Sequence, residues 1–229
     1  PDLTATGKTI QKEDLERLLR NDVKLQSYVD QAFKKELFKV SPEEKPEYNG
    51  IQLINSKVIV SYLKQLLRND LQYTPFEMVA MEKKVSEEIT IQTGQGPFTL
   101  RLGGTIDRMD AKESTLRIVD YKTGRNPDPF RDFGDIFNSA SEKKYDVILQ
   151  MYLYAMLLAP DRESLLTPYI LREIVHGGTL ELASNTELTE QFKTHLREKL
   201  FEIFNPEVPF VQTSALKKCG YCPFNQICR

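Results

Sequence analysis

The strongest constraint on the fold of this chain is the alternation of side chains over residues 115–122, TLRIVDYK. Asp120 and Lys122 continue a series of apolar residues at every second position, and this period of two predicts a β-strand with one face inward. Arg117 and Tyr121 fall on the other face. Asp120 and Lys122 are therefore expected on the face that packs against the core.

A second strand is expected over residues 105–110, joined to the first by the polar turn 111–114. Folding at this turn brings Asp107 close to the segment that contains Asp120, within direct or diagonal cross-strand reach. Two carboxylates and the ammonium of Lys122 on an apolar face need a reason, because unpaired buried charge is costly. A buried salt bridge is one explanation. A divalent cation held by the carboxylates, with the lysine beside it, is the other.

The second explanation has a defined chemistry. Mg²⁺ prefers oxygen ligands, usually one or two carboxylates together with waters and substrate phosphates. Such a metal can activate water and neutralise the charge that develops on a phosphodiester. A neighbouring lysine can stabilise the same oxyanion or help to deprotonate the water. The pattern D-x12-D-x-K thus indicates phosphodiester hydrolysis as a candidate activity.

The runs G-x-I-D-R-x-D and I-V-D-Y-K-T-G closely resemble the RecB-type nucleases of the PD-(D/E)xK superfamily. The resemblance implies that Asp107, Asp120 and Lys122 carry metal binding and catalysis, and that the carbonyl of Tyr121 is a further metal ligand. It also implies an α/β, restriction-endonuclease-like fold, with a mixed central sheet flanked by helices and an N-terminal helical portion. The implied cofactor is Mg²⁺ or Mn²⁺, and the implied substrate is DNA.

Residues 147–159 predict a buried helix, since Gln150 is its only polar side chain besides the tyrosines. Gln150 and Tyr154 are four residues apart and therefore lie on one helix face. A lone glutamine in a buried helix is most often hydrogen-bonded to backbone. However, Q-x-x-x-Y on the helix after D-Y-K is also an element of the similar nucleases. The resemblance therefore implies that Gln150 and Tyr154 orient the active site or the nucleic acid strand.

Glu82 lies in an earlier expected strand. Related nucleases often carry an acid in the element before the metal aspartate, which makes Glu82 a candidate third ligand or a support for the ligands. A solvated strand glutamate is the alternative.

All three cysteines, Cys219, Cys222 and Cys228, lie in the last eleven residues. Their C-x2-C-x5-C spacing suits thiolate ligation of a metal or cluster, and their odd number disfavours a disulfide framework. The arrangement is similar to the C-terminal part of the iron–sulfur staple in AddB-like nucleases. That resemblance implies a [4Fe–4S] cluster whose fourth cysteine is missing from this chain. His176 or His195 as a zinc ligand stays open.

Similar nucleases also carry a histidine before the first aspartate, whereas both histidines here follow Lys122. Together with the missing fourth cysteine, this favours a C-terminal fragment of a longer protein over a divergent, inactive relative. The formal net charge of −2 argues against a self-sufficient, strongly basic nucleic-acid binder. We therefore expect a helicase domain or subunit of the same complex to supply most of the DNA affinity.

Length and composition allow one domain, with 229 residues of which 40% are hydrophobic. We expect a helical portion over 1–72, a nuclease core over 76–204 and a C-terminal cysteine segment over 213–229. No run of eighteen apolar residues occurs, so no membrane span is expected, and the expected location is cytoplasmic.

The remaining elements follow from periodicity and turn residues. The expected helices are 11–39 (broken near 21–22), 51–70 with the inner stripe Ile54, Val58, Tyr62 and Leu66, and 186–204. The expected strands are 76–85, 87–93, 97–109, 165–174 and 179–183. Residues 125–145 form a long loop, a candidate for contacting DNA or gating the site.

The sequence as a whole favours a metal-dependent DNA nuclease, the exonuclease module of a recombination or repair helicase-nuclease. A non-catalytic DNA-binding or scaffolding module with this fold and the cysteine-bound metal or cluster is the main alternative. A zinc-binding structural domain with coincidental acids is a third.

Overall fold

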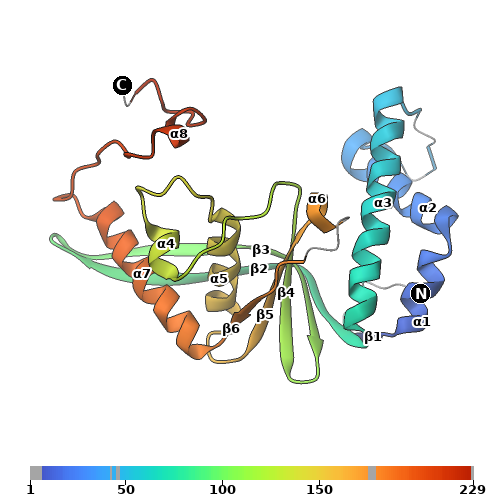
Figure 1. The fold of residues 1–229 in the computed structure, drawn as a ribbon, viewed down its shortest axis with the longest axis horizontal. Coiled ribbons are helices and arrows are strands. Elements are labelled where there is room, and N and C mark those ends of the chain that lie inside the picture. Colours follow the sequence, from blue (N-terminus) through green and yellow to red (C-terminus); the bar gives the residue numbers. More distant parts are fainter. Residues whose placement is uncertain (1–6, 42, 45–46, 175–178, 228–229) are drawn as a thin grey trace.

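The computed structural model describes residues 7–41, 43–44, 47–174 and 179–227. A six-stranded mixed sheet, in the order β1-β2-β3-β4-β5-β6, is flanked by helices (Figure 1). The expected restriction-endonuclease-like α/β architecture is thus confirmed. The strands are β1 (Lys8–Ile10), β2 (Phe76–Thr93), β3 (Gly96–Lys112), β4 (Thr115–Lys122), β5 (Ser164–Ile170) and β6 (Leu182–Ser184).

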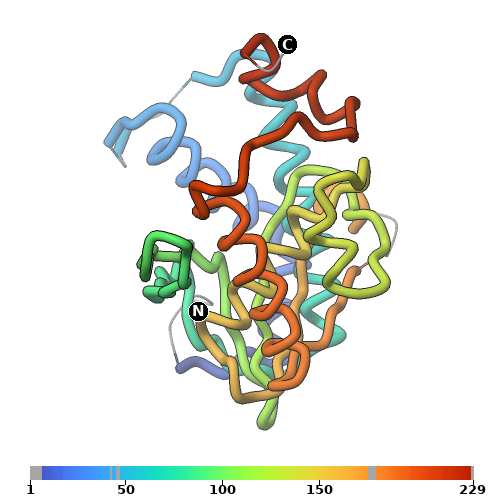
Figure 2. Tube along the Cα trace, turned by 90° about the vertical axis from the view of Figure 1, so that its left-hand side faces the viewer, coloured from blue at the N-terminus to red at the C-terminus, as the bar shows by residue number. Residues whose placement is uncertain are grey.

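Helices precede, separate and follow the strands of this sheet. They are α1 (Lys12–Leu19), α2 (Asp22–Ala32), the π-helical segment η1 (Phe33–Phe38), α3 (Gly50–Tyr73), α4 (Phe133–Phe137), α5 (Asp146–Leu158), α6 (Leu171–Ile174), α7 (Thr186–Phe204) and α8 (Leu216–Cys219). The α1–α3 helices gather at one end of the molecule, and α4, α5 and α7 lie over the rest of the sheet (Figure 1). The tube in Figure 2 shows α7 running along this helical layer.

Strand β4 is buried on both faces. It pairs antiparallel with β3 and parallel with β5, and α5 forms the connection between the parallel strands. Ile118 belongs to the main core beneath α5, whereas Val119 packs with Tyr169 and Leu66 on the α3 side. The prediction of a single inward face was therefore wrong. A strand in a parallel pair is normally covered on both sides, and α3 supplies the second cover here.

The expected strands 76–85 and 87–93 form one continuous strand, β2. It pairs along the whole of β3, and Figure 1 shows the resulting hairpin extending beyond the other strands. A register shift between Met78 and Ala80 and a positive φ of 50° at Glu82 interrupt β2 without ending it. The turn between β3 and β4 is shorter than expected, because Lys112 and Thr115 already pair.

The break in the N-terminal helices falls where expected, since Asn21 caps α2 by accepting a hydrogen bond from the Lys24 amide at 2.9 Å. The inner stripe expected on α3 is only partly correct. Leu66 packs against the sheet, but Ile54 and Val58 are 64% and 42% exposed. The first half of α3 rises away from the strands, so this part of its stripe has no sheet beneath it (Figure 1).

Beyond β4, the expected helices and strands recur with shifted limits. The helices expected over 147–159 and 186–204 correspond to α5 and α7. The strand expected over 165–174 ends at Ile170 and continues as α6, and the long loop 125–145 contains α4. No helix in the described part of the chain is both long enough and apolar enough to cross a membrane.

Candidate active site

The hairpin of β3 and β4 brings the two predicted carboxylates together. The last paired residues at this end are Arg108 and Val119, so the next residues along the two strands are Asp107 and Asp120. The Tyr121 amide donates a hydrogen bond to Asp107 Oδ2 at 2.8 Å, which fixes the Asp107 side chain across the hairpin. The expected cross-strand proximity is therefore present.

Lys122 lies on the same face of β4 as Asp120, as the alternation predicted. Its Nζ is 2.7 Å from Asp120 Oδ2, and the two side chains are 27% and 2% exposed. No hydrogen-bond donor among the described residues is aligned on this buried oxygen, although the lysine is within ion-pair distance. This oxygen of Asp120 is therefore compensated by the ion pair with Lys122 alone among the described residues.

The electrostatics of Asp120 agree with this geometry. Burial holds the pKa of Asp120 above its ordinary value although Lys122 lowers it, and the charge of Asp107 also raises it. An ionised Asp120 is thus a buried carboxylate whose desolvation Lys122 only partly compensates. Oxygen donors with a shortage of positive charge fit a hard divalent cation such as Mg²⁺ or Mn²⁺.

A third carboxylate does not join this pair. The β2–β3 register places Glu82 between the paired residues Met81 and Lys83, opposite Asp107, but Glu82 is exposed. The described residues contain no group of three His, Cys, Asp or Glu side chains that could hold a metal ion. A cation at this site would therefore depend on two carboxylates, with backbone oxygen, water or substrate completing its ligands.

Helix α5 is tied to the strand that carries Asp107. Gln150 Nε2 donates a hydrogen bond to Tyr154 Oη, and Tyr154 Oη donates to the Thr105 carbonyl, both at 2.7 Å. Gly104 allows this approach, because a Cβ there would lie 2.9 Å from the Tyr154 ring. The structure thus bonds Gln150 to Tyr154, and Tyr154 to the backbone two residues before Asp107. The charges of the site also act on the Tyr154 hydroxyl and shift its pKa.

The opposite face of the same hairpin carries a charge cluster that the sequence did not reveal. We call it the buried ion network, and it consists of Asp70, Arg108, Asp110 and Arg117. Arg117 binds both oxygens of Asp110 at 2.8 Å, and Arg108 Nη1 binds Asp70 Oδ2 at 2.6 Å. All four side chains are buried. The network joins α3 to β3 and β4 directly behind the two candidate metal ligands.

Tyr121 makes contacts on both faces of the hairpin. Its amide holds Asp107, while its ring stacks on Tyr169 and its Oη accepts a hydrogen bond from Arg108 Nη1 at 3.3 Å. The side chain therefore lies on the α3 side, away from the carboxylates. The candidate role of Tyr121 as a metal ligand concerns its carbonyl only.

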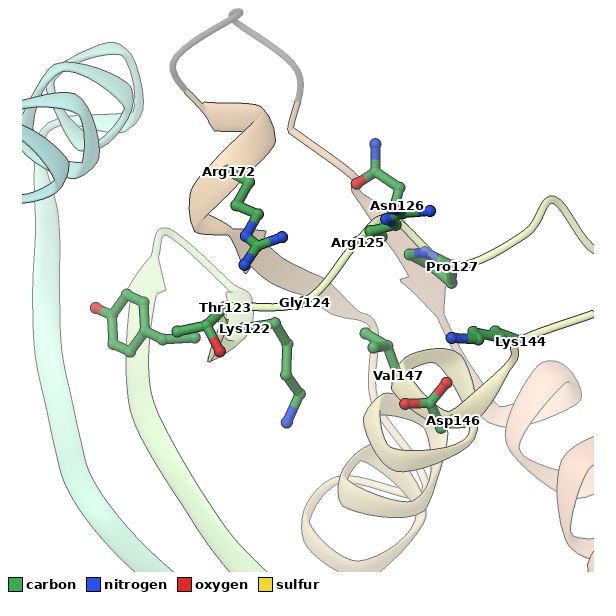
Figure 3. A pocket seen from close by; sticks show the side chains of 11 residues that line it. Lys122, Thr123, Gly124, Arg125, Asn126, Pro127, Lys144, Asp146, Val147 and Arg172 are labelled. Carbon is green, nitrogen blue, oxygen red and sulfur yellow. The ribbon is translucent and has the colours of Figure 1, made fainter. Parts of the chain in front are cut away.

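A pocket of about 580 Å³ opens beside Lys122 (Figure 3). We call it the basic pocket, because four cations line it: Lys122, Arg125, Lys144 and Arg172. Sequence reasoning assigned Lys122 to the site and gave the 125–145 loop only a general role. Arg172 was missed because α6 was expected to be a strand.

The cysteine segment is described only in part. Cys219 and Cys222 are free and half-buried, and Cys228 and His176 lie outside the described residues. His195 stacks on Phe137 and faces Glu198 on α7, with no metal-binding group around it in the described part of the chain. The structure therefore gives no support for zinc at His195, and it does not describe the full cysteine set.

Comparison with known proteins identifies the family. A family model described as the PD-(D/E)XK nuclease superfamily matches residues 7–229. No curated protein matches the chain. A solved structure described as "Crystal structure of SSO0001" shares 14% identity, covering 93% of this chain and 95% of that chain, with a TM-score of 0.34. A TM-score this low supports no structural conclusion, so the family match alone carries the assignment.

Proposed function

The chain belongs to the PD-(D/E)XK nuclease superfamily, and from that premise we propose that it is a divalent-metal-dependent nuclease that hydrolyses phosphodiester bonds in DNA. Members of the superfamily are generally nucleases and usually use divalent metals. The observation that carries the proposal is the contact of 2.7 Å between Lys122 and the buried Asp120, beside Asp107 and at the edge of the basic pocket.

The proposed metal ligands are Asp107, Asp120 and the carbonyl of Tyr121. The unaligned oxygen of Asp120 and its raised pKa support this assignment. Asp107 is already held in place by the Tyr121 amide. A bound divalent ion would supply Lewis-acid activation of water and neutralise charge on the phosphate. The described residues would hold it with two carboxylates, which is the number that Mg²⁺ sites commonly use.

Lys122 is the proposed catalytic cation. Its ammonium sits between the buried carboxylate of Asp120 and the open pocket, where a phosphoryl oxygen could replace part of its solvation. There it would stabilise the negative charge that develops during attack on phosphorus. Gln150 and Tyr154 are proposed as positioning residues, because their hydrogen bonds fix α5 against β3 next to Asp107.

We also propose the finer assignment to the RecB/AddB type, with exonuclease action beside a helicase domain or subunit. The Q-x-x-x-Y element at Gln150 and the cysteine spacing support it. The net charge of −2 agrees with DNA affinity that resides largely in a partner. A [4Fe–4S] cluster at Cys219, Cys222 and Cys228, completed by a cysteine from outside this chain, belongs to the same proposal.

A cleavage assay with a matched lysine control tests the proposed activity. Labelled single- and double-stranded DNA is incubated with the protein over a titration of Mg²⁺ and Mn²⁺. Lys122→Met should abolish cleavage and keep metal binding, because the ammonium is not a ligand. Lys64→Met is the control, because Lys64 also forms an ion pair of 2.7 Å and is 25% exposed. Lys64 lies on α3, and its partner Asp22 is 69% exposed.

The carboxylate variants complete the assay. Asp107→Ala and Asp120→Ala should each weaken Mn²⁺ binding strongly, as measured by calorimetry. Near-normal turnover by Lys122→Met would return that lysine to the status of an ordinary ion-pair partner. Binding of DNA by the wild-type protein without cleavage at any metal concentration would support the alternative of a non-catalytic DNA-binding or scaffolding module.

A further inference from the structure

The basic pocket is built from three separate segments that meet beside the candidate active site. The end of β4 and the following loop supply residues 121–127. The start of α5 supplies Asp146 and Val147, with Lys144 just before the helix, and α6 supplies Arg172. Figure 3 shows these side chains distributed round one open space, with Lys122 at its edge. The pocket therefore continues directly from the place where Lys122 meets Asp120.

The charge of this pocket is unbalanced. Four cations line it and Asp146 is the one anion among the described lining residues. In the described part of the chain, Arg125, Lys144 and Arg172 have no ion-pair partner, whereas Arg101, Arg108, Arg117 and Arg131 all have one. Like charges gathered without partners do not stabilise a fold, so an anionic ligand accounts for their position better than packing does.

The first turn of α5 borders the same space through Asp146 and Val147. Its N-cap residue, Tyr145, makes no side-chain capping hydrogen bond, whereas Asn49 and Asn185 cap α3 and α7. The first amides of a helix point outward and carry partial positive charge, which attracts anions. The positive end of the α5 dipole thus adds to the charge of the pocket cations, while Asp146 in the same turn opposes it.

Hydrogen bonds also fix one wall of the pocket at Lys144. Asp128 and Lys144 are joined by two hydrogen bonds: the Lys144 amide donates to Asp128 Oδ2 at 2.8 Å, and the Asp128 amide donates to the Lys144 carbonyl at 3.0 Å. These bonds close the loop between β4 and α5 at its base. A preformed site loses less entropy on binding than one that must be ordered.

We propose that the basic pocket binds a backbone phosphate of the substrate strand, next to the phosphodiester that is cleaved. The inference rests on the proposed function and adds a second contact to it. Arg125, Lys144 and Arg172 hold this second phosphate, and Lys122 lies between it and the carboxylate pair. A strand that occupies both places is fixed in position along the site, and the pocket acts on strand binding rather than on the chemical step.

A binding experiment tests the pocket without any need for hydrolysis. A single-stranded oligonucleotide of about 12 nucleotides, without terminal phosphates, is titrated in EDTA over a range of salt concentrations. The variant Arg125→Gln/Lys144→Gln/Arg172→Gln should bind on the order of tenfold more weakly at low salt. The slope of log affinity against log salt should fall by about 0.7 for each phosphate that the variant no longer neutralises.

The control, Arg17→Gln/Arg20→Gln/Lys57→Gln, removes the same number and kind of charges elsewhere. These exposed residues lie on α1, at its C-cap and on α3, and their replacement should change the affinity less than twofold. An equal loss of affinity in both triple variants would show that only net charge matters and would overturn the site. Since no cleavage is measured, this result is independent of whether the protein hydrolyses DNA.

Neutral linkages locate the phosphate within the strand. In a series of oligonucleotides, one phosphodiester at a time is replaced by an uncharged methylphosphonate. A methylphosphonate at one position should weaken binding to the wild type but not to the pocket triple variant. This is the result expected for interacting partners in a double-mutant cycle. A sensitivity that appears only when a terminal phosphate is added would overturn the backbone assignment in favour of the strand end. The same sensitivity in both proteins would overturn the proposal.

Discussion

Replacing Arg117 by methionine should destabilise the protein severely. Arg117 is 2% exposed, binds both oxygens of Asp110 at 2.8 Å and reaches Asp70 at 3.1 Å. Methionine keeps much of the volume but leaves two buried carboxylates to share Arg108. Breaking a buried pair by removing one partner costs about 3–5 kcal/mol, because the remaining charge is uncompensated. For a chain of this size, Tm should fall by roughly 6–20 °C.

Denaturant unfolding followed by circular dichroism measures this loss of stability, with Arg101→Met as the matched control. Arg101 lies on β3 and pairs with Glu88 at 3.1 Å, but the two side chains are 71% and 63% exposed. Exposed pairs contribute at most about 1 kcal/mol. If the free energies of unfolding of Arg117→Met and Arg101→Met differ by less than about 1 kcal/mol, burial of the network does not make its ion pairs stronger than exposed ones.

A double variant separates charge from volume. Asp110 and Arg117 are cross-strand partners, so Arg117→Met/Asp110→Leu removes a complete pair and leaves Asp70 with Arg108. The double variant should regain part of the stability that Arg117→Met loses, because no unmatched carboxylate remains. Strictly additive losses would mean that packing volume alone explains the effect.

Three further predictions concern single residues. Burial raises the pKa of Asp70, but its arginine partners hold that pKa below the usual range. The ionised Asp70 therefore stabilises the protein fully above the unfolded-state pKa of about 3.9, and this stabilisation is lost as the pH falls through the lower folded-state pKa. In denaturant titrations, the stability advantage of wild type over Asp70→Asn should shrink below about pH 4. Asp120→Asn should raise Tm in EDTA, because it removes a buried charge whose desolvation Lys122 only partly compensates. It should also abolish the rise in Tm that Mn²⁺ gives the wild type, and a lower Tm in EDTA would contradict this reasoning. Gly104→Ala should reduce cleavage, because the new Cβ would push the Tyr154 ring away and break its hydrogen bond to β3. Gly50→Ala is the control, since Gly50 has open space around it and its replacement should leave cleavage unchanged. Equal cleavage rates in the two variants would show that the Tyr154 hydrogen bond does not position the site.

The alternation in the β4 sequence predicted the strand, the hairpin and the shared face of Asp120 and Lys122. These features depend on contacts within about fifteen residues, where period and turn length fix the register. The apolar sequence of α5 predicted its burial for a similar reason. The local pattern could not reveal α3 on the far side of β4, because its contacts join residues 38 to 47 positions apart.

Arg117 shows this limit most directly. Alternation placed it opposite the core face, and an arginine there is normally solvent-exposed. Its burial depends on Asp70, whose position in the sequence offers no signal. The exposure of Ile54 has the converse cause, since helical period marks an apolar stripe but not whether a sheet lies beneath it. Arg172 was missed because a single turn of helix after β5 leaves no periodic pattern.

The buried ion network also determines where the chain can be divided. Asp70 is the only member contributed by the N-terminal helices, and it accepts hydrogen bonds from Arg108, Arg117 and Tyr169. Without residues 1–72, two buried guanidinium groups would share Asp110, and the Tyr169 hydroxyl would lose its acceptor. The charges of the strands behind the active site are therefore balanced only when the N-terminal helices are folded against them. A division at the junction before β2 would therefore leave the charge network of the strands incomplete.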